Sequence, residues 1–193
     1  LTCTDSAART VAKRLGQFIG EETARKVGVY TFHSFAEDVM EKFPEAFPAY
    51  LDRRLMGEVE QTLVWRDVLE KASETSLRSA KAPFHYLKDL RSLEDDLTRE
   101  RITLESYAAW LDERAKEIES DPTLQYVKGE RQGELNAKGR EKLERLEKGR
   151  DAIRLIAAYR AEKDVRGLYG YTDVLRIAVD ALATDEALRA DLQ

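Results

Sequence analysis

The sequence predicts a mainly α-helical fold, in which a helical bundle is joined to a short strand–helix portion. Charged residues make up 36% of the 193-residue chain, and only four prolines and ten glycines interrupt it. Its commonest residues are good helix formers, and apolar residues recur at helical spacing throughout the part after Tyr50. A strand-like stretch lies only before that point. The length suits one substantial domain, or one and a half small ones.

The first forty-five residues predict a helix, a strand and a second helix. Thr4 and Asp5 are positioned to cap a first helix, which Gly20 can end. Residues 27–31 alternate and are β-branched or aromatic, which predicts a short strand. Ser34 then begins Ser-Phe-Ala-Glu, the pattern of a capping box, so we expect a helix from Phe35 to about Pro44. The apolar face of the first helix consists of Ala8, Val11, Leu15 and Ile19.

The rest of the chain predicts helices separated by polar segments. The apolar spacing gives helices over about 51–71, 84–93, 103–118, 139–163 and 174–182, with polar linkers at 73–81 and 129–139. Thr184 is expected to cap a final turn. The helices over 103–118 and 139–163 are expected to pair as an antiparallel hairpin. Both tryptophans, Trp65 and Trp110, are expected to lie in the core. His85 is expected to pack against a helix.

The charge distribution leaves two interpretations open for the long C-terminal helix. The net charge of −5 argues against an isolated, tightly binding nucleic-acid protein, but residues 128–166 hold twelve Lys and Arg against eight Asp and Glu. Lys138, Lys142 and Arg145 share one helical face. That face is either a solvated surface with internal ion pairs, such as Glu141–Arg145 and Glu144–Lys148, or a contact to the backbone of duplex DNA that would weaken with salt.

The sequence contains no recognisable catalytic or metal-binding motif. Cys3 is the only cysteine, and His33 and His85 are the only histidines, so a disulfide framework and a Cys-rich zinc site are excluded. The phosphate loop Gly-x-x-x-x-Gly-Lys-Ser/Thr is missing, as are Gly-x-Ser-x-Gly and His-Glu-x-x-His. No catalytic residue, metal ligand or cofactor is therefore assigned within these residues. The sequence shows neither a signal peptide nor an apolar run of membrane-spanning length, so a cytoplasmic location is expected.

Two stretches near the start resemble motifs of superfamily 1 DNA helicases of the UvrD/Rep/PcrA type. Residues 1–15, Leu-Thr-Cys-Thr-Asp-Ser-Ala-Ala-Arg-Thr-Val-Ala-Lys-Arg-Leu, are similar to the family motif T-F-T-N-K-A-A-x-E-M-x-x-R. Residues 27–36, Val-Gly-Val-Tyr-Thr-Phe-His-Ser-Phe-Ala, resemble its next motif, hydrophobic-x-T-F-H-S/G-hydrophobic. Near the other end, Tyr-Gly-Tyr-Thr-Asp-Val-Leu at 169–175 is similar to D-F/Y-D-D-L-L. The resemblance frames the whole chain but is close only in these stretches.

This resemblance implies a domain organisation. Residues 1–45 would form the edge of the RecA-like domain 1A, residues 46–166 the helical insertion 1B, and residues 167–193 a return toward domain 1A. The chain would then be an internal fragment of an ATP-dependent 3′–5′ DNA helicase. The ATP-binding loop would lie before Leu1 and the Walker B acids after Gln193, so ATP and Mg²⁺ would belong to the parent protein and the fragment alone would be inactive.

The resemblance also implies partners and site residues. In the family, the first two motifs line the track for single-stranded DNA, so Thr4, Thr31 and His33 are expected to contact the strand, with Ser34 helping through its backbone amide. From the residues alone, His33 is better explained as an imidazole that hydrogen-bonds across a turn, and the two roles can coexist. Lys138, Lys142 and Arg145 are the expected contacts to a duplex junction.

The sequence departs from the family pattern at several positions. Cys3 stands where the family has an aromatic residue that can stack on a base, and Asp5 and Ser6 replace an Asn and a Lys that would suit a phosphate. Of the acids in D-F/Y-D-D-L-L, only Asp173 is kept. These differences indicate a divergent member with a weaker grip on DNA. A helicase-like subunit of a RecB/AddA-type helicase-nuclease and a stand-alone helical interaction module remain alternatives.

Overall fold

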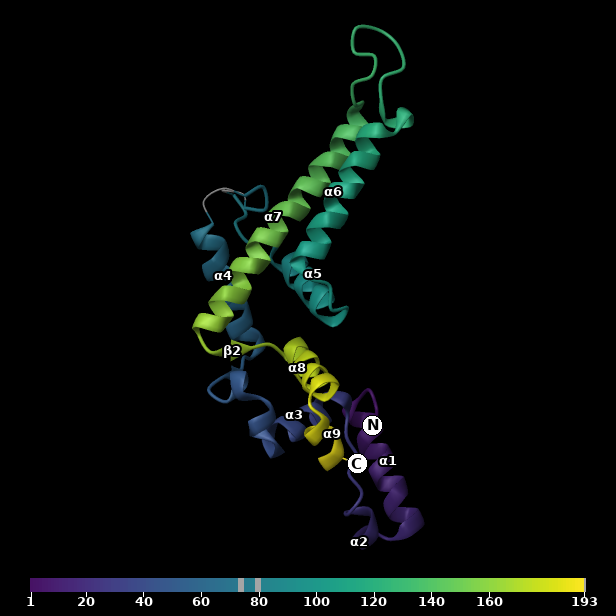
Figure 1. Ribbon diagram of the computed structural model, residues 1–193, viewed down its shortest axis with the longest axis vertical. Helices are drawn as coiled ribbons and strands as arrows, with labels where there is room; N and C mark the ends of the chain where they lie inside the picture. Colours follow the sequence, from purple (N-terminus) through teal and green to yellow (C-terminus); the bar gives the residue numbers. More distant parts are fainter. Residues whose placement is uncertain (73–74, 79–80, 193) are drawn as a thin grey trace. The chain divides into compact units, whose positions relative to one another are not determined.

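The computed structural model describes residues 1–72, 75–78 and 81–192 and confirms a mainly α-helical protein (Figure 1). The chain forms two compact units. Unit 1 consists of Leu1–Leu55 and the C-terminal residues from Tyr169, and unit 2 consists of Met56–Leu168. The assignment of residues 1–45, 46–166 and 167–193 to RecA-like and insertion domains stays a prediction. Along the described chain, no helix has both the length and the apolar character needed to cross a bilayer.

Unit 1 is built around the packing of α3 against α8. Its buried core includes Val39 and Phe47 from the N-terminal part and Val174, Ile177 and Leu188 from the C-terminal part. Its elements are α1 (Asp5–Ile19), α2 (Glu21–Ala24), α3 (Phe32–Lys42), the 3₁₀ turns η1 (Pro44–Ala46) and η2 (Pro48–Tyr50), the short strand β1 (Arg54–Leu55), α8 (Tyr171–Thr184) and α9 (Glu186–Asp191). A second short strand, β2 (Leu168–Tyr169), pairs with β1.

The first helix agrees with the prediction, but the strand predicted at 27–31 is wrong. Of the two expected caps, Thr4 caps α1, whereas Asp5 is the first residue of the helix; Gly20 follows its last residue, as expected. The predicted apolar face of α1 is not buried within unit 1, since no residue of this helix is buried. In place of a strand, the structure has an isolated parallel bridge between Thr2 and Thr31. An extended segment becomes a strand only when a neighbour supplies a ladder of hydrogen bonds, and among the described residues pairing is limited to this bridge.

The start of α3 corrects the predicted capping box. The helix begins at Phe32, three residues before the predicted start, and its N-cap is Thr31. Ser34 is the third helical residue and not the cap. Similarly, Asp185 and not Thr184 caps the last helix, because the Asp185 carboxylate accepts a hydrogen bond from the Leu188 amide at 3.0 Å.

The helix predicted over 51–71 is shorter than expected. Two prolines, Pro44 and Pro48, each begin a 3₁₀ turn, and the chain then passes through β1 before α4 (Glu58–Lys71) starts. Proline at the first position favours such turns because its φ is already helical and its nitrogen has no proton to donate. Leu51 and Leu55 fall within the predicted range but lie outside the observed helix and are 59% and 38% exposed.

Unit 2 is organised along one long helix, α7 (Ala137–Val165), which has 29 residues and packs against α4, α5 and α6. Figure 1 shows α6 and α7 side by side, and their contacts run antiparallel, as predicted. Arg150 Nη2 lies 2.7 Å from Asp112 Oδ1, whereas the N-terminal end of α7 lies beside Leu124. The other elements of the unit are α5 (Leu87–Arg99), α6 (Leu104–Ser120) and the 3₁₀ turn η3 (Pro122–Leu124). The polar linker predicted at 73–81 lies partly outside the described residues.

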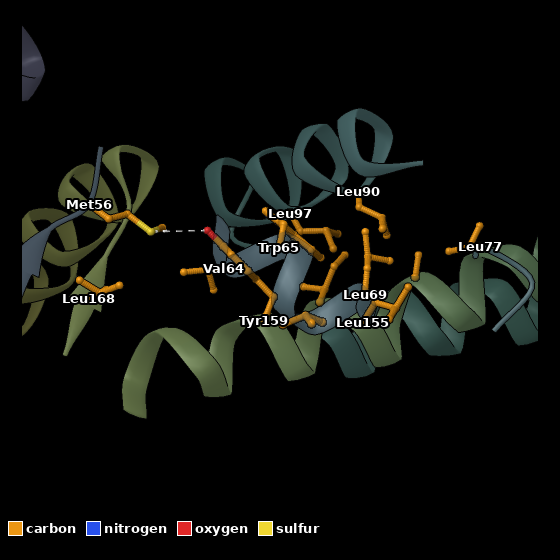
Figure 2. Packing of buried hydrophobic residues seen from close by; sticks show 13 residues of the cluster. Met56, Val64, Trp65, Leu69, Leu77, Leu90, Leu97, Leu155, Tyr159 and Leu168 are labelled. Carbon is orange, nitrogen blue, oxygen red and sulfur yellow. Dashed lines mark hydrogen bonds between the residues drawn. The ribbon is translucent and has the colours of Figure 1, made fainter. Parts of the chain in front are cut away.

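The core of unit 2 centres on a stack of two aromatic rings. The rings of Trp65 on α4 and Tyr159 on α7 are 4.1 Å apart and nearly parallel, at 6°, and both side chains are fully buried. Figure 2 shows leucines from α4, α5 and α7 gathered beside them, and the Tyr159 hydroxyl donating to Met56 Sδ at 3.9 Å. The prediction that Trp65 is a core residue is confirmed.

A buried ion cluster lies beside this core. Glu94 on α5 is 3% exposed, and its Oε1 atom accepts hydrogen bonds from Thr98 Oγ1 at 3.2 Å and from Arg160 Nε at 3.4 Å. Lys163 Nζ lies 3.8 Å from the same oxygen. Because a buried carboxylate is costly without partners, these contacts fix how α5 lies against α7.

The loop between α6 and α7 has defined backbone contacts. The Tyr126 amide donates to the Glu134 carbonyl at 2.9 Å, and the Gly133 amide donates back to the Tyr126 carbonyl at 3.0 Å. Gly133 has a φ of +86°, a conformation that glycine adopts without strain. The loop was predicted to reach residue 139, but Asn136 caps α7 and the helix begins at Ala137.

Gly139 provides a test of the packing at this end of α7. A Cβ atom at this position would lie 2.8 Å from the Leu124 carbonyl oxygen, which already accepts a hydrogen bond from Asn136. We expect Gly139→Ala to lower the free energy of unfolding by about 1–2 kcal/mol despite the better helix propensity of alanine. Urea denaturation checks this. The control is Gly16→Ala, also inside a helix, where the nearest atom would lie 3.7 Å from the new Cβ, so the free energy of unfolding should not fall.

Asp151 anchors the segment at 75–77 to α7. Its Oδ2 atom accepts hydrogen bonds from the Ser76 amide at 2.6 Å and from the Ser76 hydroxyl at 2.7 Å, and Arg154 pairs with Oδ1. Burial alone would raise the pKa of Asp151, but these hydrogen bonds outweigh it and lower the pKa to about 2. The ionised carboxylate therefore stabilises the folded protein.

We expect Asp151→Asn to lower the free energy of unfolding by about 2 kcal/mol at pH 7. Because the folded pKa lies below the unfolded value, this contribution is present above pH 4 and falls to about half at pH 3. Urea denaturation of both proteins from pH 7 to pH 3 measures the difference. A loss that is equally large at pH 3 and pH 7 would contradict the assignment to the ionised form. Asp112→Asn, which removes an exposed ion-pair partner, is the control and should cost less than about 1 kcal/mol.

Candidate nucleic-acid interface

Two short backbone segments bring the starts of α1 and α3 to one edge of unit 1. The Thr2 amide donates to the Tyr30 carbonyl at 3.0 Å, and the Phe32 amide donates to the Thr2 carbonyl at 3.2 Å. The segments run parallel, and each leads directly into a helix. Since the carboxyl ends of parallel segments meet at the same edge, the N-termini of α1 and α3 lie together there. Helix N-termini present backbone amides and a partial positive charge, which suit a phosphate.

Hydroxyl side chains form the caps of these two helices. Thr4 Oγ1 accepts a hydrogen bond from the Ala7 amide at 3.2 Å. Thr31 Oγ1 accepts one from the Ser34 amide at 3.1 Å, and Ser34 Oγ accepts one from the Thr31 amide at 2.9 Å. Thr31 is only 7% exposed. The hydroxyl of Thr31 and the amide of Ser34 are therefore engaged with each other, and in this structure they set the direction of α3.

His33 is the second residue of α3 and stacks on Tyr171, the first residue of α8. The ring centroids are 3.8 Å apart and the planes differ by 5°. Tyr171 is 58% exposed, so the pair presents an aromatic surface at the edge where α1 and α3 begin. Tyr171 was not predicted as a site residue, although it lies in the third resembling stretch. The sequence signal that could have identified it is an aromatic residue that directly follows a glycine at the start of a helix.

Asp173, the acid kept in that stretch, has a structural role in α8. It is 8% exposed, and its Oδ2 atom accepts a hydrogen bond from the Gly170 amide at 2.8 Å. Arg176 Nη2 lies 3.5 Å from Oδ1. The carboxylate thus satisfies a backbone amide at the start of the helix and holds Tyr171 in its place at the first helical position.

The electrostatics of the ring pair favour a neutral imidazole. Burial lowers the pKa of His33 below its usual value of 6.5, and the nearby Glu37 carboxylate opposes this change. Burial also raises the pKa of Tyr171, with smaller contributions from Glu37 and Asp5. The carboxylates of α1 and α3 therefore lie near the rings. At neutral pH this surface can form hydrogen bonds and stack on flat groups, but it does not supply positive charge.

The structure thus brings the N-terminal site residues of the prediction to one edge of unit 1, while the predicted duplex contacts form a separate set in unit 2. Lys138, Lys142 and Arg145 are exposed along α7, and Arg145 pairs with Glu141 at 2.6 Å. The predicted pair Glu144–Lys148 is also present, at 3.4 Å. Within the described ranges, no group of three His, Cys, Asp or Glu side chains could hold a metal ion.

Two sequence-based expectations about aromatic residues in unit 2 are wrong. Trp110 is 51% exposed, and His85 is also exposed. Trp110 precedes Leu111, which is buried against α7, so the indole lies at the border of the packed face of α6. Apolar spacing identifies such a face, but it does not distinguish its centre from its border.

The His33–Tyr171 stack makes a prediction that concerns pKa values alone. We expect Tyr171→Ala to raise the pKa of His33 toward 6.5, because removal of the phenol ring lets water reach the imidazole. Glu37→Gln should lower it further, because the opposing carboxylate is lost. Proton NMR titration of the imidazole measures both, with His85→Ala to assign the two histidine signals. Shifts of the same sign in the two variants would contradict this account.

Comparison with known proteins gives one result that covers the whole chain. The sequence model of the family described as UvrD/REP helicase N-terminal domain matches residues 1–193. No curated protein and no solved structure matches the chain. The match includes both segments that lead into α1 and α3 as well as the start of α8. The chain therefore belongs to the UvrD/REP helicase N-terminal domain family.

Proposed function

We propose that this chain contributes part of the single-stranded DNA track of an ATP-dependent 3′–5′ DNA helicase. The observation that carries the proposal is the stack of His33 on the exposed Tyr171 at the edge where α1 and α3 begin. Family membership supports a nucleic-acid ligand, and the geometry supports a particular kind of contact. Flat exposed rings can stack on bases of any sequence, and nearby hydroxyls and helix amides can bind the sugar-phosphate chain.

In this proposal, each residue of the edge has a distinct part. Tyr171 offers a ring for a base, and His33 supports that ring from the other side while its nitrogen atoms can bind the sugar-phosphate chain. Thr31 and Ser34 hold α3 in place through their mutual capping, and Thr4 does the same for α1. Glu37 and Asp5 lie close enough to influence these groups, so they repel phosphate and weaken the grip.

Unit 2 is proposed to be the insertion subdomain 1B, a scaffold with a duplex-facing surface. Lys138, Lys142 and Arg145 are its candidate contacts to the duplex backbone, since all three are exposed along α7. The residues of this chain contain no phosphate loop, so the proposal gives them no step in ATP hydrolysis. ATP and Mg²⁺ are proposed to act elsewhere in the helicase, and steady-state turnover of ATP by the purified chain would contradict this division.

Binding to a fluorescein-labelled oligothymidylate, measured by fluorescence anisotropy at low salt, tests the proposed track. We expect Tyr171→Ala to weaken binding about fivefold or more, because a stacking partner is lost. His33→Ala should weaken it about threefold or more, because the supporting ring and its nitrogen atoms are lost.

The matched control is the other histidine of the chain. His85 is exposed and lies in unit 2, so His85→Ala should leave the affinity unchanged. Circular dichroism and thermal denaturation check that each variant is folded. Unaltered binding by both folded variants at the edge, Tyr171→Ala and His33→Ala, would contradict the proposal.

A further inference from the structure

A groove on unit 2 combines an exposed indole with cationic side chains. It has a volume of about 310 Å³ and is formed by α6, α7 and the turn between them. Its floor is apolar, because Ile118 and Leu124 are buried and Leu146 is half-buried. Trp110 stands on its rim. The groove lies in one compact unit and shares no residue with the edge formed by His33 and Tyr171.

Trp110 is held in a defined position although half of it is open to solvent. Its ring is parallel to that of Tyr107, at 8°, with the centroids 5.8 Å apart, one helical turn away on α6. Tyr107 is partly buried and packs against the core of unit 2, so the supporting ring is itself held in place. The Trp110 indole is 51% exposed and is already held against Tyr107. It therefore loses little conformational entropy when a flat group stacks on its exposed face. The other tryptophan of the unit, Trp65, is fully buried, so the two indoles have opposite environments.

Three cations line the same groove: Arg114, Lys142 and Arg145. Arg114 pairs with Glu117 and Arg145 pairs with Glu141, but all four side chains of these pairs are more than half exposed. Exposed pairs contribute little and can be exchanged for a phosphate. Lys142, together with Lys138, lowers the pKa of Asp121, although the hydrogen bonds from Thr123 are the larger cause. Two carboxylates, Glu117 and Asp121, also line the groove, so its charge is mixed with one cation in excess.

We propose that this groove binds an unpaired nucleotide, with its base stacked on Trp110 and its phosphate held by Lys142 and Arg145. The inference rests on the proposed helicase function but adds a second single-strand site, which shares no residue with the edge at His33 and Tyr171. It moves Lys142 and Arg145 from the duplex backbone to the phosphate of an unpaired nucleotide. An apolar floor with an exposed indole and flanking cations is the combination that single-strand binding surfaces use. A regular duplex keeps its bases stacked inside and cannot offer one to Trp110.

Intrinsic fluorescence tests this directly, because the chain has only two tryptophans and Trp65 is fully buried. Titration with unlabelled oligothymidylate is expected to quench the emission, and Trp110→Phe is expected to abolish the quenching while the Trp65 emission remains. An abasic oligonucleotide of equal length should bind without quenching. Quenching by a blunt duplex as strong as by the single strand, or an absence of quenching by the single strand, would overturn the proposal.

The cations are tested by the salt dependence of binding. The double variant Lys142→Gln, Arg145→Gln should reduce the slope of log affinity against log salt by about 0.7, since the two cations hold one phosphate and each neutralised phosphate contributes about 0.7 for single strands. Lys116→Gln, which removes an exposed cation of α6 that does not line the groove, should leave the slope unchanged. An unchanged slope in the double variant would contradict the assignment of the phosphate to these residues.

The two proposals can fail separately. If Tyr171→Ala and His33→Ala leave binding intact while Trp110→Phe abolishes quenching, the track proposed for unit 1 is wrong and the groove stands. If binding depends on Tyr171 and His33 but Trp110 is never quenched, the groove proposal is overturned and the proposed function stands.

Discussion

The stack of Trp65 on Tyr159 is the contact on which unit 2 depends. Two large flat rings, one from α4 and one from α7, fill the centre of the core with no exposed surface, and leucines of α4, α5 and α7 pack around them. Flat rings at van der Waals distance tolerate sliding poorly, so the stack sets the distance and the rotation between the two helices. The hairpin of α6 with α7, and the groove that it forms, are built on a helix whose orientation is fixed in this way.

Polar contacts around the same part of α7 add directional constraints to the apolar ones. Arg160 and Lys163 follow Tyr159 on α7 and meet Glu94 of α5, whose side chain is buried. Apolar side chains alone would accept several rotations of α5 with similar energy. A buried carboxylate does not, because any rotation that separates it from its cations leaves a charge without compensation. Specificity of helix orientation is the benefit that such a cluster gives.

Local signals in the sequence predicted much of this fold. Thr4 was a recognisable cap because a hydroxyl before an apolar helical pattern has one obvious partner, the amide three residues later. At the start of α3, two such patterns compete, Thr31 with Ser34 and Ser34 with Glu37. The pairing of Thr2 with Thr31 decides between them, since it makes Thr31 the last extended residue. That pairing joins segments far apart in the chain, and so does the contact between His33 and Tyr171. Tertiary contacts of this kind leave no periodic trace in a single sequence.

The resemblance to the helicase motifs predicted which N-terminal residues lie at the site, but not how their side chains are arranged. Thr31 and Ser34 were expected to face a ligand, yet their hydrogen bonds are directed at each other, whereas an aromatic residue from the start of α8 supplies the exposed surface. The carboxylates of Glu37 and Asp5 lie near that surface. In the proposed track, a surface without positive charge would depend more on stacking than on charge neutralisation.

The length of α7 has a mechanical consequence. An uninterrupted helix of 29 residues is a rod of about 43 Å, and it contains no proline at which it could bend. The stack and the ion cluster clamp this rod near its C-terminal end, whereas Lys142 and Arg145 lie near the other end. A rod clamped in this manner acts as a lever, so a tilt of about 5° at Tyr159 moves the start of the helix, about 33 Å away, by about 3 Å. Any force that a bound strand exerts at that end would be felt as a torque at Tyr159.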